Sequence, residues 1–208
     1  MPRAALQPAD IAVVRDRLAT AATRLFARHG YEAVTMRAVA AELGMSAMTP
    51  YRYLGGKDEL VALVRAQAFR RFADALDAAG AGAREPIARL MRLKAGYVGF
   101  AQAEPDAYRI MFELRAPPDG HRFPELAAAS RRAFGCLLDA VTAAIAAGAL
   151  TGEPMAVAQL LWASTHGLVA LYLAGHLTRA ALNRLATIDH ELAGFRPARP
   201  PPRSRRRT

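Results

Sequence analysis

The chain has 208 residues, 53% of them hydrophobic, and a formal net charge of +10 with a pI near 10.7. This hydrophobic content is enough to bury a sizeable core, which argues against an intrinsically disordered chain, and the single cysteine, Cys136, excludes an internal disulfide framework. The basic balance favours an acidic partner such as nucleic acid or an anionic membrane surface.

The excess positive charge lies at the two ends of the sequence. Residues 1–57 carry eight Lys or Arg and four Asp or Glu, residues 58–195 carry fourteen of each, and residues 196–208 carry six Arg and no acid. A neutral body with basic ends indicates a local polyanion-binding segment rather than a generally basic protein. We expect 1–9 to be a flexible N-terminus and the Arg- and Pro-rich 196–208 to be a disordered tail, because it has no large apolar residue to bury.

Helical spacing of apolar residues begins at Ile11 and predicts a first helix that stops at Gly30. A second helix is expected to start at Thr35, a good N-cap, and to end at Gly44. A third, short helix of about two turns is predicted over 47–53. It is followed by two glycines that break the chain again.

The rest of the sequence also has helical periodicity, and a proline lies near the start of most predicted helices, where its missing N–H costs least. A loop is predicted over 115–123, and no convincing strand is found, so the fold class is all-α. The further predicted helices cover 57–77, 85–103, 105–114, 124–147, 153–175 and 178–193.

Residues 35–53 have the form helix, tight turn, short helix, which is the arrangement of a helix-turn-helix. Tyr51, Tyr53 and Lys57 follow closely, and the glycines at 55–56 permit close approach of the backbone. Phenol hydroxyls, an ammonium group and a helix N-terminus together suit phosphate oxygens. The sequence therefore predicts a DNA-binding segment here.

The stretch TMRAVAAELGMSAMTPYRYLGGKDEL at 35–60 resembles the tetracycline-repressor (TetR/AcrR) family of bacterial transcription regulators. A shorter match, WASTHG at 162–167 after PDAYRIMFEL at 105–114, is similar to the variant C-terminal domain named for Trp, His and Gly. The resemblance implies a three-helix DNA-binding domain, here 10–57, and a larger helical domain, here 58–195, that dimerises and holds an effector.

The resemblance also assigns expected roles by position. Tyr51 and Lys57 would hold phosphates, and Thr35 would cap its helix and contact the DNA backbone. Pro50 departs from the bulky aliphatic residue common in the family, and we expect it to stiffen the recognition helix near its start. The simpler alternative for Tyr51 and Tyr53 is packing in the core. For Arg37 it is a solvated charge on the helix surface. Residues expected to face base edges, or to reach either bases or phosphates, are Arg37, Ala47, Met48, Thr49, Arg52 and Tyr53, with Arg37 the best candidate for a guanine.

The neutral body shows no spacing typical of metal ligands and no nucleophile–base arrangement, so we predict neither an enzyme nor a cofactor or metal. Aromatic and soft side chains could instead line a cavity for a small apolar or aromatic effector, although each is also explained as ordinary core. These candidates are Tyr97, Phe100, Tyr108, Met111, Phe112, Phe134, Trp162 and His166, of which His166 most needs a polar partner.

The uncharged apolar segment 155–175 is long enough to span a membrane, but a helix apolar all round is also expected in a dimer interface. We predict a cytoplasmic homodimer formed through the helices near 153–175 and 178–193. It would bind a palindromic operator in double-stranded DNA, as a repressor released by its effector. The alternatives are a nonspecific or architectural DNA-binding protein that uses its basic ends, and a membrane-associated helical protein.

Overall fold

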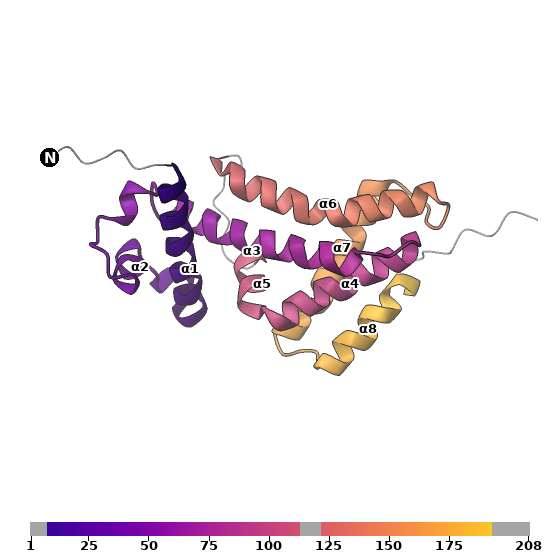
Figure 1. Cartoon of the computed structure of the whole chain (residues 1–208). Helices are drawn as coiled ribbons and strands as arrows, with labels where there is room; N and C mark the ends of the chain where they lie inside the picture. The colour runs from indigo at the N-terminus through magenta and orange to yellow at the C-terminus, as the bar shows by residue number, and fades with distance from the viewer. Residues whose placement is uncertain (1–7, 113–121, 193–208) are drawn as a thin grey trace, which may run out of the picture. The chain divides into compact units, whose positions relative to one another are not determined.

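A computed structural model describes residues 8–112 and 122–192, and within these ranges the chain forms eight α-helices, one 3₁₀ helix and no β-strand (Figure 1). The predicted all-α fold class is confirmed. The elements are α1 (Pro8–Ala33), α2 (Met36–Glu42), η1 (Pro50–Arg52), α3 (Lys57–Gly80), α4 (Pro86–Ala103), α5 (Pro105–Phe112), α6 (Pro124–Ala146), α7 (Pro154–Leu173) and α8 (Arg179–Leu192).

Proline is the first residue of α1, η1, α4, α5, α6 and α7. The first backbone N–H groups of a helix have no intrahelical acceptor, so a residue without an N–H is tolerated there and its fixed φ favours the helix. This local rule explains why the predicted starts of α4, α5, α6 and α7 lie within one residue of the observed ones. Most of the predicted loop over 115–123 and the whole predicted tail over 196–208 lie outside the described residues.

Two predicted boundaries differ in the first helix. α1 already begins at Pro8, so the last two residues of the expected flexible N-terminus, 1–9, are helical. At the other end, α1 does not stop at Gly30 but kinks there and continues to Ala33. Gly30 has φ +73° and ψ 171°, a conformation that an L side chain rarely adopts, so the glycine bends the chain without ending it.

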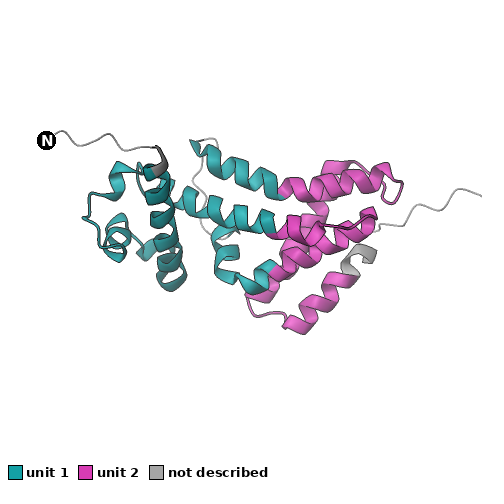
Figure 2. Ribbon diagram, in the orientation of Figure 1, with its two compact units in different colours: residues 1–74, 100–133 teal, residues 75–99, 134–208 magenta. Residues whose placement is uncertain are grey.

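The chain divides into two compact units (Figure 2). Unit 1 comprises residues 1–74 and 100–133, and unit 2 comprises residues 75–99 and 134–208. α3, α4 and α6 each contribute residues to both units. The functional boundary expected between 57 and 58 is a different kind of division, and it stays a prediction.

In unit 1, α1 contacts both α2 and α5. The apolar side of α1 is buried, including Leu18, Ala22 and Phe26, and α2 adds Val39. Burying such side chains stabilises a fold by roughly 1.5–3 kcal/mol each for the larger ones. This packing fixes α2, and with it the segment that follows α2.

In unit 2, the core forms between α6 and α7. Val141 and Ala144 of α6 pack with Val157 and Ala158 of α7, and Leu150 in the connecting turn completes the cluster. α7 and α8 also pack against each other.

Candidate nucleic-acid interface and ligand cavity

The turn after α2 is built from capping hydrogen bonds. The hydroxyl of Thr35 accepts the N–H of Ala38 at 3.1 Å, which confirms Thr35 as the N-cap. At the other end, the N–H groups of Gly44 and Met45 donate to the carbonyls of Ala41 and Ala40 at 3.0 and 2.9 Å. Gly44 has φ +65°, the left-handed conformation expected of a glycine that ends a helix. The chain is thereby turned away from α2 within a few residues.

Replacing Thr35 by Ala is expected to lower the free energy of unfolding by about 1 kcal/mol, because it leaves an N-terminal N–H of α2 without its acceptor. Thr35 is exposed, so little packing is lost. Urea unfolding monitored by circular dichroism measures the change. Thr35→Ser keeps the hydroxyl and is the matched control; equal destabilisation of both variants would contradict a capping role.

The recognition segment, residues 47–53, is not the two-turn helix predicted from the sequence. It is a hydrogen-bonded turn, in which the N–H of Thr49 donates to the carbonyl of Ser46 at 2.9 Å, followed by the single 3₁₀ turn η1. In an α-helix capped at Ser46, residue 50 would donate to the Ser46 carbonyl, and Pro50 has no N–H to donate. The pattern therefore shifts to bonds between residues three apart, such as Arg52 N–H to Thr49 O at 3.1 Å.

Only a small part of the recognition segment is buried. Pro50 and the following Leu54 are buried, whereas Met48 is 69% exposed and Tyr51 is 50% exposed. Of the other residues predicted to contact DNA, Thr35, Arg37, Ala47 and Arg52 are exposed, and Thr49, Tyr53 and Lys57 are half-buried. Two buried residues thus anchor a short segment whose remaining side chains are presented to solvent.

Lys57, predicted to hold a phosphate, has partners within the protein. Its Nζ donates to the carbonyl of Tyr31 at 2.7 Å and lies 4.1 Å from the centre of the Tyr31 ring. This contact ties the first residue of α3 to the kinked end of α1. A phosphate contact by Lys57 stays a prediction, and the structure adds a positioning role for the same side chain.

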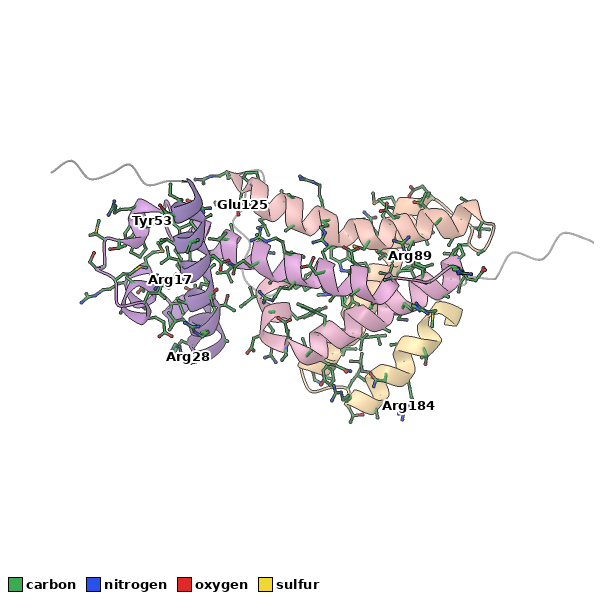
Figure 3. The ribbon with its side chains drawn as sticks, viewed as in Figure 1. Arg17, Arg28, Tyr53, Arg89, Glu125 and Arg184 are labelled. Atoms are coloured by element: carbon green, nitrogen blue, oxygen red, sulfur yellow. The ribbon has the colours of Figure 1, made fainter. Side chains whose placement is uncertain are left out.

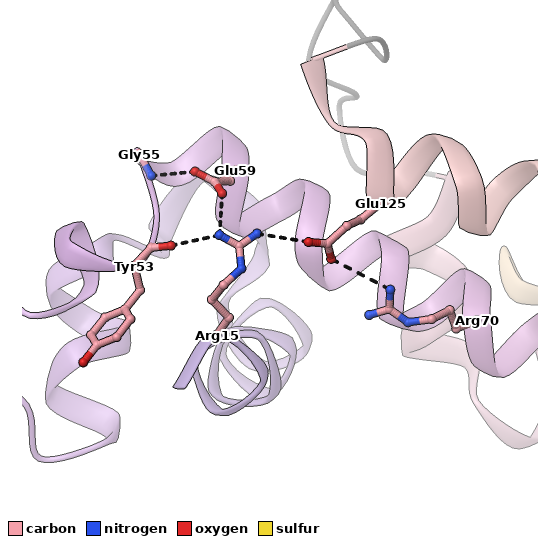
Figure 4. Close-up of polar contacts among 6 residues, drawn as sticks. All are labelled: Arg15, Tyr53, Gly55, Glu59, Arg70 and Glu125. Atoms are coloured by element: carbon pink, nitrogen blue, oxygen red, sulfur yellow. Dashed lines mark hydrogen bonds and ion pairs between the residues drawn. The ribbon is translucent and has the colours of Figure 1, made fainter. Parts of the chain in front are cut away.

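A charged network that sequence reasoning did not single out fixes the end of the recognition segment (Figure 4). Arg15 of α1 donates through Nη1 to the Tyr53 carbonyl at 2.9 Å and pairs with Glu59 at 2.6 Å. Glu59 accepts the Gly55 N–H through its other oxygen at 2.7 Å. No local pattern marks Arg15, because its partners lie 38 and 44 residues away in the sequence.

The network continues to α6 within unit 1. The second guanidinium nitrogen of Arg15 lies 3.4 Å from Glu125 Oε1, and Glu125 Oε2 lies 3.9 Å from Arg70 (Figure 4). These outer pairs are more exposed than the pair with Glu59, so solvent screens them more strongly. The main effect of the network is to hold Tyr53 and Gly55 between α1 and α3.

Burial of Glu59 by itself would raise the pKa of its carboxyl group. The hydrogen bond from the Gly55 N–H and the Arg15 guanidinium oppose this and hold the Glu59 pKa below the usual 4.5. A lowered pKa in the folded state means that the charged form adds stability above the unfolded-state pKa, and that this stability is lost as pH falls through the folded-state pKa.

Glu59→Gln is therefore expected to be less stable than the wild type at neutral pH, by about 1 kcal/mol or less because the pair is partly solvated. The difference should vanish in acid below the lowered Glu59 pKa. Urea midpoints of both proteins measured from neutral to acidic pH check this, with Glu32→Gln as a control for an exposed carboxylate outside the network. A difference independent of pH would exclude the charge as its source.

Additional basic side chains lie on α1 in unit 1. Arg17 and Arg28 are exposed (Figure 3), and so is Arg24. Arg24 and Arg28 pair with Glu42 of α2 at 3.6 and 3.0 Å. The sequence indicated this region only through its net positive charge.

Unit 2 contains a cavity of about 370 Å³ with an almost entirely apolar wall. Tyr97 and Trp162 belong to the wall, as predicted for effector contacts. Phe134 packs on Trp162 with ring centres 5.4 Å apart, and the Tyr97 hydroxyl lies 3.3 Å from Nδ1 of His166. His166 therefore has the polar partner that an imidazole in an apolar helix requires.

The other four predicted effector residues lie in unit 1, where they help form an aromatic core. Phe100 packs on Phe72 with ring centres 5.1 Å apart, and Phe112 packs on Tyr108 at 4.8 Å. Met111 is fully buried in the same unit. Residue type alone does not separate these four residues from those of unit 2, because core and cavity walls use the same apolar residue types.

α7 packs one face inside unit 2 and leaves another uncovered. Its buried residues are Val157, Ala158, Thr165 and Val169. α7 is the one helix of the described residues that is long and apolar enough to cross a membrane. Of its most apolar stretch of 18 residues, 22% is buried in the chain. The apolar residues exposed on α7 are Met155, Ala156, Leu160, Trp162, Ala163, Ala170 and Leu171.

Two parts of the chain match known families. Residues 18–64 match bacterial regulatory proteins of the tetR family, and residues 90–195 match the tetracyclin repressor-like C-terminal domain. The second match alone covers half of the chain. The chain belongs to the TetR family of bacterial regulators, whose members are transcription regulators rather than enzymes.

Individual relatives agree with this assignment. HTH-type transcriptional regulator Rv1816 of Mycobacterium tuberculosis is 30% identical over 133 residues, which are 58% of this chain and 52% of the relative. HTH-type transcriptional repressor DrrR1 of Streptomyces coeruleorubidus is 36% identical over 77 residues, 37% of this chain and 28% of that protein. The chain thus matches about half of the length of Rv1816 and less than a third of the length of DrrR1.

A solved structure from Rhodococcus sp. RHA1, of a protein with unknown function, shares the fold. Its TM-score is 0.76 at 23% sequence identity, and the match covers 96% of this chain and all of that one. At this identity the likeness concerns the fold.

Proposed function

We propose that the protein is a homodimeric regulator that binds a palindromic operator in double-stranded DNA through residues 47–53 of each subunit. The observation that carries the proposal is the exposure of Met48, Tyr51 and Arg52 on a short segment anchored by buried Pro50. Such a segment can enter a major groove, and apolar and cationic side chains there recognise thymine methyl groups and guanine, respectively.

The uncovered face of α7 supports the dimer. Leu160 is 53% exposed and Leu171 is 46% exposed, and small residues such as Ala163 between them permit close approach of a second helix. Gln159 is also exposed on α7, and its amide would be costly in lipid. A second copy of the chain, with α8 at the edge of the contact, is therefore a better match for this face than a membrane.

The proposed regulator is a cytoplasmic repressor whose DNA affinity falls when an effector occupies the cavity of unit 2. One relative carries the word repressor in its name, and the cavity has the apolar lining expected of a ligand site. An effector acts by binding better to the conformation that does not bind the operator. The division at 57/58 into DNA-binding and effector domains belongs to the same proposal.

The test is selection of duplexes from a randomised DNA library at two salt concentrations. The proposal expects one palindrome with half-sites about 34 Å apart, since the two recognition segments of a dimer enter successive major grooves on the same side of the duplex. Weak enrichment with binding that collapses in salt would instead support a nonspecific or architectural protein acting through its basic ends, including the Arg-rich 196–208.

Arg37→Ala tests the predicted guanine contact. Arg37 is exposed next to the capped start of α2. Loss of a bidentate arginine contact is expected to weaken binding by about 1–3 kcal/mol and to relax the preference at one base position in each half-site. Arg131→Ala removes the same charge from an exposed position of α6 and should leave base preference unchanged. An unchanged sequence profile for Arg37→Ala would remove Arg37 from the recognition set.

A further inference from the structure

The cavity of unit 2 has a wall whose chemistry is more specific than a general apolar site. The residues that line it are Leu76, Ile87, Leu90, Met91, Leu93, Lys94, Tyr97, Leu137, Ala149, Leu150, Leu161, Trp162 and Thr165. Most of them are aliphatic, so the wall suits a flexible alkyl chain better than a stack of planar rings. From this wall we infer that the cavity binds a straight-chain aliphatic monocarboxylate, with the carboxylate toward Lys94 and Tyr97.

The sign of the charge follows from the ionisable residues. Lys94 is the one formally charged residue among the described residues that line the cavity, and no Asp or Glu is among them. An ammonium group at the edge of an otherwise apolar wall attracts an anion more strongly than it would in water. Lys94 has an interaction partner within the protein, but an ammonium group carries three N–H donors and can bind a carboxylate in addition.

Tyr97 supplies a second donor beside Lys94. The two residues are three apart on α4, so their side chains lie on the same face of that helix. The Tyr97 hydroxyl is 3.3 Å from Nδ1 of His166. In the tautomer with hydrogen on Nδ1, His166 donates to the Tyr97 oxygen and leaves the phenol O–H to donate to the ligand. A bound carboxylate therefore favours that tautomer.

The length of the cavity wall gives a ligand size. The wall residues of α4 extend from Ile87 to Tyr97, ten steps of about 1.5 Å, which correspond to about 15 Å along a helix. An extended chain advances roughly 1.2 Å per bond, so about twelve bonds span this length.

The polar groups lie toward one end of this length. Ile87, Leu90 and Met91 precede Lys94 and Tyr97 on α4, so the N-terminal part of the wall is apolar and the C-terminal part is polar. Ile87 and Trp162 are the exposed members of the wall. This gradient matches a molecule with one anionic head and one aliphatic tail.

The inference rests on the proposed function only in taking this cavity as the effector site, and ligand binding can be measured without DNA. Trp162 is the only tryptophan of the chain and lines the cavity, so its fluorescence reports occupancy. The 208-residue chain is titrated with sodium decanoate, with 1-decanol and with decylamine, each below its aggregation concentration. A series of shorter and longer carboxylates defines the preferred chain length.

Decanoate is expected to bind at least about tenfold more tightly than decanol, because a charge-assisted hydrogen bond is stronger than a neutral one, and decylamine should bind weakest. Lys94→Met should reduce decanoate affinity to that of decanol and leave decanol affinity unchanged. Ala149→Leu enlarges a side chain of the wall and so narrows the cavity, which should shift the preferred carboxylate to a shorter chain. Equal affinities for the three head groups, or wild-type decanoate binding by Lys94→Met, would overturn the inference.

A band-shift assay on the selected operator, with and without decanoate, separates the claim that the cavity binds a carboxylate from the claim that its ligand controls DNA binding. Decanoate binding without any change in operator affinity leaves the ligand class standing and removes the effector role from the proposed function. Operator binding that responds to another compound, with no decanoate binding in the fluorescence titration, overturns the ligand class and leaves the effector role in the proposed function standing.

Discussion

Gly96→Ala is expected to lower the free energy of unfolding by about 1–2 kcal/mol, although alanine is the better helix former. A Cβ at residue 96 of α4 would lie 2.6 Å from the Cβ of Ala79 in α3 and 3.5 Å from the Ala75 carbonyl. The Ala79 Cβ is attached directly to the backbone, so no rotation of a side chain relieves the clash. Within unit 2, the two helices would have to separate.

Two opposing effects set the size of this change. Replacing a helical glycine by alanine gains about 0.5–1 kcal/mol from the reduced entropy of the unfolded chain, and overpacking costs about 1–3 kcal/mol. The clash is the larger effect at Gly96. A loss of 1–2 kcal/mol corresponds to a fall in Tm of about 2–8 °C for a chain of this size.

Gly99→Ala is the matched control in the same helix. No atom lies within 4 Å of a Cβ built on Gly99, and the residue is exposed. This variant should be more stable than the wild type by about 0.5–1 kcal/mol. Thermal and urea unfolding of both variants measure the difference, and a Gly96→Ala protein as stable as Gly99→Ala would show that α3 and α4 separate without cost.

Most of the fold could be predicted from the sequence because its signals are local. Helix starts follow from prolines such as Pro86 and Pro124, and the end of α2 follows from Gly44. Each depends on the backbone chemistry of one residue, which does not require knowledge of the tertiary structure. The N-cap at Thr35 is of the same kind.

The recognition segment shows where a local rule was applied at the wrong position. Pro50 was expected to stiffen a helix near its start, but it lies one residue beyond the N–H groups that lack acceptors in an α-helix capped at Ser46. The observed turn and η1 place Pro50 at the first position of its own short helix. The exposed residues predicted to read DNA do not depend on this correction, and their role stays a prediction.

The candidate cavity could be predicted only in part, since it depends on contacts between distant residues. Tyr97 and Trp162 were identified by residue type, whereas Lys94 and Thr165 carry no sequence signal for the cavity. Similarly, the sequence showed that 155–175 is apolar all round, but not which of its residues form the buried face. In the structure Val157 and Val169 are both buried, whereas Trp162 and Leu171 are exposed.

The double variant Leu160→Glu with Leu171→Glu is expected to convert the proposed dimer to monomers. The two leucines are the most exposed large hydrophobic side chains of α7. Burying two carboxylates against the same residues of a second copy would bring like charges together in an apolar contact, which costs several kcal/mol. Sedimentation velocity at micromolar concentration measures the change in mass.

Operator affinity should fall with the loss of the dimer by roughly three orders of magnitude or more, because a monomer contacts one half-site and loses the second binding event. Ala143→Glu adds a carboxylate at an exposed position of α6 in the same unit and should keep both the dimer and the affinity. The double variant must also retain the unfolding midpoint of the wild type, since both leucines are exposed in the single chain. A double variant that remains a dimer would assign the interface to another surface, whereas a monomer with undiminished operator affinity would show that each subunit binds DNA independently.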